Sequence, residues 1–313
     1  MTFSLTILGS SSAVPTSTRF PAAHVVNLHE RCFLIDCGEG TQIQLRRNNI
    51  GFGKIDHIFI THIHGDHTFG LFGLISTLNL LGRKYDLHLY ASPLLEQILN
   101  DHIKYFYDHP LTFRIIFHKL GSKKKQLIYE DSNALVFSFP LKHRIPACGF
   151  LFQEKPPLLN LRKEMIRFHN VPVSEMHNIK SGKDFLNEKG QTIPNALLTL
   201  PPVKARSLAY CTDTRYTESI LPVIKNADIL YHEATYLHEM KDRARETGHS
   251  TAREAGIIAR KGNVAKLIIG HFSARYKTTE PLVNEARSEF SESYAANEGD
   301  IYHIEQIRAD SPQ

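Results

Sequence analysis

The sequence contains few cysteines and no long apolar run. Four cysteines among 313 residues, with no Cys-x-x-Cys pair, exclude a disulfide-rich secreted framework, and we expect packed core thiols. No segment approaches the roughly 20 apolar residues that a membrane-spanning helix requires, so no membrane partner is expected. The N-terminal stretch MTFSLTILGSSSAVP lacks a basic region followed by a long apolar segment, which argues against a secretion signal. Together these absences predict a cytoplasmic protein.

Histidine, by contrast, is abundant. The chain has 18 histidines, and this number calls for an explanation. The net charge of +5 permits an anionic partner but does not require one. Apolar residues make up 42% of the chain and charged residues 22%, which is typical of a globular protein with a sizeable core.

Short apolar segments of strand length alternate with helical patterns along the chain. A capping-box signature, Thr251 with Glu254, opens the last predicted helix. Mixed strands and helices indicate an α/β or α+β domain in which helices cover sheets. Strands are predicted at residues 3–8, 24–28, 32–36, 55–61, 87–91, 135–140, 149–152, 207–211, 228–232 and 266–270, and helices at 68–81, 94–107 and 251–261.

Residues 153–204 interrupt this alternation. The segment has eight Lys and Arg against five Asp and Glu, several prolines and weak periodicity. Loops beyond about 15 residues are uncommon in compact domains unless they carry a function. We interpret the segment as an arm that projects from one domain spanning residues 1–313, with a short helix near 161–169. An irregular but packed surface excursion is the alternative.

The strongest chemical signal is the motif His62-Ile-His64-Gly65-Asp66-His67, which follows an apolar strand and precedes a helix. Alternate side chains of an extended chain point the same way, so His62 and His64 share a side. Gly65 lets the backbone turn, and Asp66 and His67 then project from the start of the helix. Imidazoles with a carboxylate suit zinc, and also iron or manganese. The alternative is a group of surface histidines that binds no metal.

Three further ligand-type residues each follow a predicted strand: His143, Asp213 and His271. Taken singly, each could be a capping or hydrogen-bonding residue. Taken with the motif, they complete seven ligands for two metals. A single carboxylate between two ions can bridge them, and Asp213 is the candidate.

With these residues and several further stretches, the chain resembles the ribonuclease Z family, the tRNA 3′-processing endonucleases of the metallo-β-lactamase superfamily. The resemblance covers residues 3 to 276 and implies a metallo-β-lactamase αββα sandwich with an inserted arm. Its stretches are DCGEGTQ at 36–42, HGDHTFGL at 64–71, HRIP at 143–146, HEATY at 232–236, GHST at 248–251 and GHFSARY at 270–276.

The resemblance also implies a mechanism with two zinc ions per chain, although manganese or iron would suit the same ligands. Between them the ions activate a water that attacks a phosphodiester. Asp66 would accept the proton of that water as well as bind metal. His249, oriented by Glu233, would protonate the leaving 3′-oxygen, so that the tRNA keeps a 3′-hydroxyl. Outside its motif, His249 would be a structural residue at a helix N-terminus. One ion would be held by His62, His64, His143 and Asp213, and the other by Asp66, His67, His271 and Asp213.

The implied partners are precursor tRNA, gripped by the arm at 153–204, and a second copy of the chain in a homodimer. Arg19, Arg275 and Tyr276 are candidate substrate contacts, although Arg275 and Tyr276 could instead cap their loop. Two other functions stay open at this stage. One is a hydrolase of the same superfamily that acts on a small phosphodiester or ester, and the other is a non-catalytic, zinc-stabilised RNA-binding module.

Overall fold

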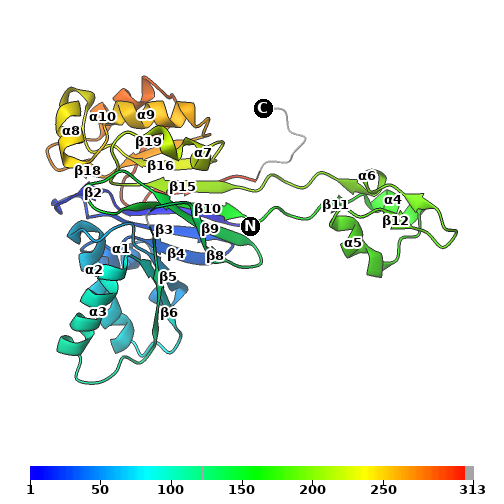
Figure 1. The fold of residues 1–313 in the computed structure, drawn as a ribbon, viewed down its shortest axis with the longest axis horizontal. Coiled ribbons are helices and arrows are strands. Elements are labelled where there is room, and N and C mark those ends of the chain that lie inside the picture. Colours follow the sequence, from blue (N-terminus) through cyan, green and yellow to red (C-terminus); the bar gives the residue numbers. More distant parts are fainter. Residues whose placement is uncertain (122, 307–313) are drawn as a thin grey trace. The chain divides into compact units, whose positions relative to one another are not determined.

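Two seven-stranded sheets face each other in the computed structural model, which describes residues 1–121 and 123–306 (Figure 1). Position 122 and residues 307–313 of the expected 1–313 domain lie outside the described residues. The first sheet has the order β20-β1-β3-β4-β5-β6-β7. Its strands are β1 (Phe3–Gly9), β3 (Ala23–Leu28), β4 (Arg31–Ile35), β5 (Ile55–Phe59), β6 (Leu87–Ala91), β7 (Ile115–Lys119) and β20 (Ile301–His303).

The second sheet has the order β19-β17-β16-β15-β10-β9-β8. Both sheets are mixed: β4 to β7 run parallel in the first, as do β15, β16, β17 and β19 in the second. Ligand sites form outside the carboxyl ends of such parallel strands. The strands are β8 (Gln126–Glu130), β9 (Ala134–Pro140), β10 (Cys148–Glu154), β15 (Ser207–Cys211), β16 (Ile229–Glu233), β17 (Leu267–Gly270) and β19 (Ser293–Ala295).

Helices cover the outer face of each sheet, which gives the layer order helix, sheet, sheet, helix (Figure 1). The inner faces meet in an aromatic core around Phe33, Phe59, Phe150 and Tyr210. The first sheet is covered by α1 (Thr41–Arg47), α2 (Gly65–Leu80) and α3 (Pro93–Phe106), and helices of the second side are α7 (Leu221–Ile224), α8 (Lys241–Thr247), α9 (Ala252–Lys261) and α10 (Glu280–Arg287). Short 3₁₀ turns are η1 (Phe52–Lys54), η3 (Glu218–Ile220) and η4 (His238–Met240), and β2 (Ser11–Ser12) pairs with β18 (Phe272–Ser273).

The chain divides into two compact units, of which the first comprises Met1–Gln153 and Ser207–Ile304. The second is built around Glu154–Arg206 and has its own small core, which includes Ile166, Ile179 and Leu198. Glu154 and Arg206 join its two ends through a buried ion pair of 2.6 Å. Its elements are β11 (Asn160–Leu161), α4 (Lys163–Phe168), η2 (Val173–Glu175), α5 (Met176–Lys180), β12 (Phe185–Leu186), β13 (Thr192–Ile193), α6 (Asn195–Leu198) and β14 (Thr199–Leu200).

Most of the expected elements are present, with ends that shift by a few residues. The capping box is formed: Thr251 caps α9, and the side chain of Glu254 accepts from the backbone N–H of Thr251. In the first unit, sequence reasoning missed helices and strands whose apolar patterns are weak or brief: α1, α7, α8, α10, β2, β7, β8, β18, β19 and β20. The four cysteines are buried free thiols. Among the described helices, none is both long and apolar enough to cross a membrane.

Candidate metal centre and active site

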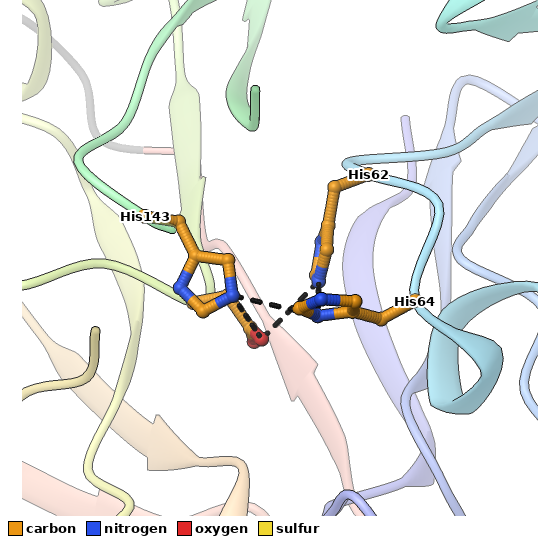
Figure 2. A group of neighbouring side chains, drawn as sticks. His62, His64 and His143 are labelled. Carbon is orange, nitrogen blue, oxygen red and sulfur yellow. Dashed lines mark hydrogen bonds and ion pairs between the residues drawn. The ribbon is translucent and has the colours of Figure 1, made fainter. Parts of the chain in front are cut away.

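The first cluster of ligand-type side chains is His62, His64, His143 and Asp213, whose ligand atoms all lie within 4.8 Å of one another. The two motif histidines follow β5, whereas His143 follows β9 and Asp213 follows β15. His62 Nε2 lies 2.9 Å from His64 Nδ1, and His143 Nε2 lies 3.4 Å from the same atom. Figure 2 shows the three imidazoles turned toward one another. Asp213 Oδ2 lies 3.3 Å from His62 Nε2 and 3.7 Å from His143 Nε2.

The second cluster is Asp66, His67 and His271. Asp66 and His67 occupy the first turn of α2, and His271 follows β17. Asp66 Oδ2 lies 3.5 Å from the Nε2 atom of each histidine. Asp213 Oδ1 lies 3.4 Å from His67 Nε2 and 3.0 Å from His271 Nε2. The two oxygens of Asp213 therefore face different clusters.

Both clusters have the chemistry and the spacing of a metal site. With zinc ligands about 2.05 Å from the ion, neighbouring ligand atoms of a tetrahedral site are about 3.3 Å apart. The distances given above are 2.9–3.7 Å in the first cluster and, when Asp213 is counted with it, 3.0–3.5 Å in the second. Within the described chain, the buried Nε2 atoms of His67 and His271 have no hydrogen-bond partner, although carboxylate oxygens lie close by. Buried polar atoms are rarely left unpaired, so these nitrogens fit a metal.

The orientation of His67, His271 and His143 is fixed by the ring nitrogen that faces away from the clusters. His67 Nδ1 donates to Asp36 Oδ2 at 2.8 Å, and His271 Nδ1 lies 3.0 Å from the hydroxyl of Thr235. His143 Nδ1 donates to the backbone carbonyl of Gly248 at 2.9 Å. Such outer partners hold a ligand in the tautomer that leaves the metal-facing nitrogen free. Sequence reasoning did not assign these partners, although Asp36, Thr235 and Gly248 all lie within motifs quoted above.

Three residues of the centre have a left-handed backbone. Asp36, Asp213 and His271 each lie just beyond the end of a strand, with φ of 56°, 44° and 58°. Non-glycine residues seldom adopt this region. There the backbone turns sharply, so these side chains point across the sheet edge instead of continuing the alternation of the strand.

Glu233 and His249 form a hydrogen-bonded pair beside the clusters. Glu233 is fully buried, and its Oε1 accepts from His249 Nδ1 at 3.0 Å and from the backbone N–H of Thr214 at 2.6 Å. Its Oε2 accepts from Thr235 Oγ1 at 2.7 Å and from the backbone N–H of Ser250 at 3.1 Å. Burial lowers the pKa of His249, but the facing carboxylate of Glu233 more than offsets this and raises it to about 9. His249 also has a ring nitrogen within 4.8 Å of ligand atoms of Asp213 and His271.

The charge of Asp66 is also set by its surroundings. Burial raises the pKa of Asp66, but His67 and His271 more than offset this and hold it well below its ordinary range. Asp66 Oδ2 additionally accepts the backbone N–H of Ala13 at 2.8 Å. The carboxylate is therefore ionised and fixed in position by the loop that follows β2.

The candidate substrate residues are less clearly placed. Arg19 donates to the carbonyl of Lys277 at 3.4 Å, and the Arg275 side chain donates to Ser273 Oγ at 3.0 Å. Tyr276 Oη accepts the backbone N–H of Leu237 at 3.0 Å, a contact that holds its own loop. These contacts favour a capping role for Tyr276 and leave substrate binding by the two arginines a prediction.

Comparisons with known proteins identify the family. The model of a family described as Anti-Pycsar protein Apyc1 matches only residues 3–155, so the full-length relatives decide the family. Ribonuclease Z of Bacteroides thetaiotaomicron is 47% identical over 95% of this chain and 93% of its own, and that of Porphyromonas gingivalis is 45% identical over 95% and 97%.

Solved structures agree with this result. Human tRNase Z, short form, has a TM-score of 0.69 at 26% identity and covers 96% of this chain and 98% of its own. The metallo-β-lactamase fold protein YhfI of Bacillus subtilis has a TM-score of 0.68 at 17% identity and covers 97% of this chain and 100% of its own. At this identity the likeness shows the fold alone. The expected metallo-β-lactamase sandwich is confirmed, and the chain belongs to the ribonuclease Z family.

Proposed function

We propose that this chain is a metal-dependent endoribonuclease that removes the 3′ trailer from precursor tRNA. The observation that carries the proposal is the pair of ligand clusters joined by Asp213, with the His249–Glu233 pair beside them. These features occur in a chain that is 47% identical to a ribonuclease Z over nearly its whole length. Two clusters that share one carboxylate match the two-metal arrangement used for phosphodiester hydrolysis, which supports hydrolysis more than two separate structural zinc sites.

We assign one metal ion to His62, His64, His143 and Asp213, and a second to Asp66, His67, His271 and Asp213. Zinc suits these ligands, and manganese or iron would suit them too. When bound, two such ions supply a nucleophilic hydroxide near neutral pH and neutralise charge on the phosphodiester. The shared position of Asp213 and the unpaired Nε2 atoms support two ions in place of one.

The residues around the ions have separate tasks. Asp66 is ionised and held by the N–H of Ala13, so it is positioned to accept the proton of the attacking water. His249 holds a proton because Glu233 stabilises its charged form, and it is positioned to donate that proton to the leaving 3′-oxygen. The product tRNA then carries a 3′-hydroxyl.

The unit at Glu154–Arg206 is our candidate for the arm that binds tRNA away from the cut. Residues 153–204 carry a net charge of +3, which suits a phosphate backbone. Because β10 and β15 pair as antiparallel neighbours, with Gln153 opposite Ser207, a short linker can replace the segment between them. The shortened chain should lose precursor tRNA cleavage and still hydrolyse a small chromogenic phosphodiester. If it cleaves both as before, this unit does not bind the precursor tRNA; if the full-length chain hydrolyses only the small phosphodiester, the activity is that of a small-substrate hydrolase.

The decisive experiment maps the cleavage site on a precursor tRNA with and without a chelator, together with metal content per chain. A cut that leaves a 3′-hydroxyl at the base of the trailer, lost with chelator and restored by zinc, supports the proposal. The His249→Ala variant tests the proton donor: kcat should fall by roughly 10²- to 10⁴-fold with metal content unchanged. A kcat within about twofold of the original excludes that role. Sedimentation equilibrium tests the proposed homodimer.

A further inference from the structure

A cavity beside the ligand clusters has walls that the proposed chemistry does not use. Its volume is about 440 Å³, and it is bordered by His64 and Asp66 from the clusters. Phe69, Arg144 and Glu39 line the same cavity. An open cavity beside candidate ligand residues has room for the part of a substrate next to the reacting phosphate.

Phe69 is an aromatic residue that the packing of its helix does not require. The buried stripe of α2 runs through Leu71, Leu74, Ile75 and Leu78, whereas the Phe69 side chain is 67% exposed. Its ring lies directly over Gly65, where a Cβ would collide with it. The ring is therefore held at the mouth of the metal centre with much of its surface open to solvent.

Arg144 supplies a free cation in the same wall. It follows His143 directly and is exposed, and no hydrogen bond or ion pair engages its guanidinium anywhere in the described chain. A guanidinium matches the geometry of a phosphate and stays charged at any working pH. Glu39 adds a hydrogen-bond acceptor, which suits the hydroxyl and amino donors of a ribonucleotide.

We propose that Phe69 and Arg144 form a subsite for one unpaired ribonucleotide adjoining the cut. The Phe69 ring stacks on the nucleobase, and the Arg144 guanidinium binds a phosphate beside that base. Proteins that bind single-stranded RNA combine these two contacts, because every base has a face that stacks and every nucleotide carries a phosphate. The inference rests on the proposed function and specifies how the RNA is held at its reacting end.

The test of stacking compares Phe69→Leu with Phe69→Tyr on precursor tRNA. Leucine keeps an apolar side chain without an aromatic face, and we expect KM to rise roughly 5- to 150-fold, with kcat changed far less. Tyrosine keeps the face and should stay within about twofold. Hydrolysis of bis(p-nitrophenyl) phosphate and metal content should be unchanged in both variants. Phe106→Leu is the matched control, since Phe106 is 75% exposed on α3 and does not line the cavity.

A substrate with an abasic position identifies the stacked nucleotide. Removing the correct base should weaken cleavage by the original chain and add nothing to the defect of Phe69→Leu. If the loss from base removal and the loss from Phe69→Leu add fully at each position next to the cut, stacking by Phe69 is refuted.

The test of Arg144 is the salt dependence of KM. Each phosphate contact to a single strand contributes about −0.7 to the slope of log affinity against log salt. Arg144→Ala should make the slope shallower by about that amount, whereas Lys104→Ala, at an exposed cation on α3, should leave it unchanged. If the original chain cleaves precursor tRNA but the Phe69 and Arg144 variants keep its KM and its salt slope, the subsite is refuted and the proposed function stands. Failure of the original chain to cleave precursor tRNA overturns the proposed function.

Discussion

The substitution Asp36→Asn tests whether one buried carboxylate controls the metal affinity of the second cluster. Asp36 Oδ1 accepts the backbone N–H of Thr61 at 2.8 Å, and Oδ2 accepts His67 Nδ1 at 2.8 Å. Asparagine has the same shape and tolerates the left-handed backbone at this position, so the fold should persist. Its remaining oxygen can still serve Thr61, but an amide NH₂ then faces His67 Nδ1.

The proton of His67 must in that case move from Nδ1 to Nε2. Nε2 is the atom that faces Asp66 and Asp213, and a protonated nitrogen cannot bind metal. Loss of an outer partner of this kind costs roughly 10- to 100-fold in metal affinity, or about 1.4–2.7 kcal/mol. The loss should fall on one metal equivalent, because the first cluster does not include His67.

Competition with a chromophoric zinc chelator measures this directly. We expect two equivalents of similar affinity in the original chain and one weakened equivalent in Asp36→Asn, with an unchanged far-ultraviolet circular dichroism spectrum. Cleavage should recover when zinc is raised in proportion to the lost affinity. If both equivalents bind as before, Asp36 does not orient a ligand and the assignment of the second cluster is wrong.

Three further substitutions probe other parts of the molecule. Gly248→Ala places a Cβ 2.9 Å from His143 Nδ1 at a position with φ of 85°, so metal content per chain should fall by one equivalent; full occupancy would show that the loop yields. Glu298 accepts the backbone N–H groups of Ser10 and Phe20, which flank the 11–19 loop, and the N–H of Ala13 in this loop holds Asp66. Glu298→Ala should therefore lower kcat/KM roughly tenfold, whereas Glu298→Gln should retain it. Burial lowers the pKa of His57 to about 4 in the folded chain. In the unfolded chain this histidine already binds a proton below about pH 6.5, so the stability of the fold declines as the pH falls from about 6.5 to about 4. Between pH 7 and pH 5 this histidine should lower the free energy of unfolding in urea by about 2 kcal/mol. His57→Phe should remove this loss, and an equal loss in both chains would contradict the lowered pKa.

The sequence allowed the two clusters of candidate ligands to be predicted because their members carry local signals. His62, His64, Asp66 and His67 lie within six residues, and Asp213 and His271 each end an apolar strand that was recognisable by itself. Parallel strands bring their carboxyl ends to one edge, so the convergence of these residues follows from elementary geometry. The same logic placed the capping box of α9 at Thr251.

The partners that orient the ligands could not be predicted in this way. The hydrogen bond from His67 to Asp36 joins residues 31 apart in the sequence, and the contact of His143 with Gly248 joins residues 105 apart. No spacing rule identifies such pairs, since they depend on how neighbouring strand ends and loops pack in the folded chain. The cavity at Phe69 and Arg144 escaped for the same reason: each residue looks ordinary until the fold places both against the metal clusters.

The left-handed backbones of Asp36, Asp213 and His271 limit how this centre could be transferred or evolve. Each costs about 1–2 kcal/mol and would relax if the chain were free to choose its own conformation. The ligands therefore do not assemble the centre by themselves; the stacked sheets impose a geometry that the local sequence resists. Copying the His-x-His-x-Asp-His motif onto another scaffold would reproduce the donors without the strand ends that aim Asp213 and His271. The unit that evolution can reuse is thus the whole sheet edge, with its strand ends and the loops that follow them.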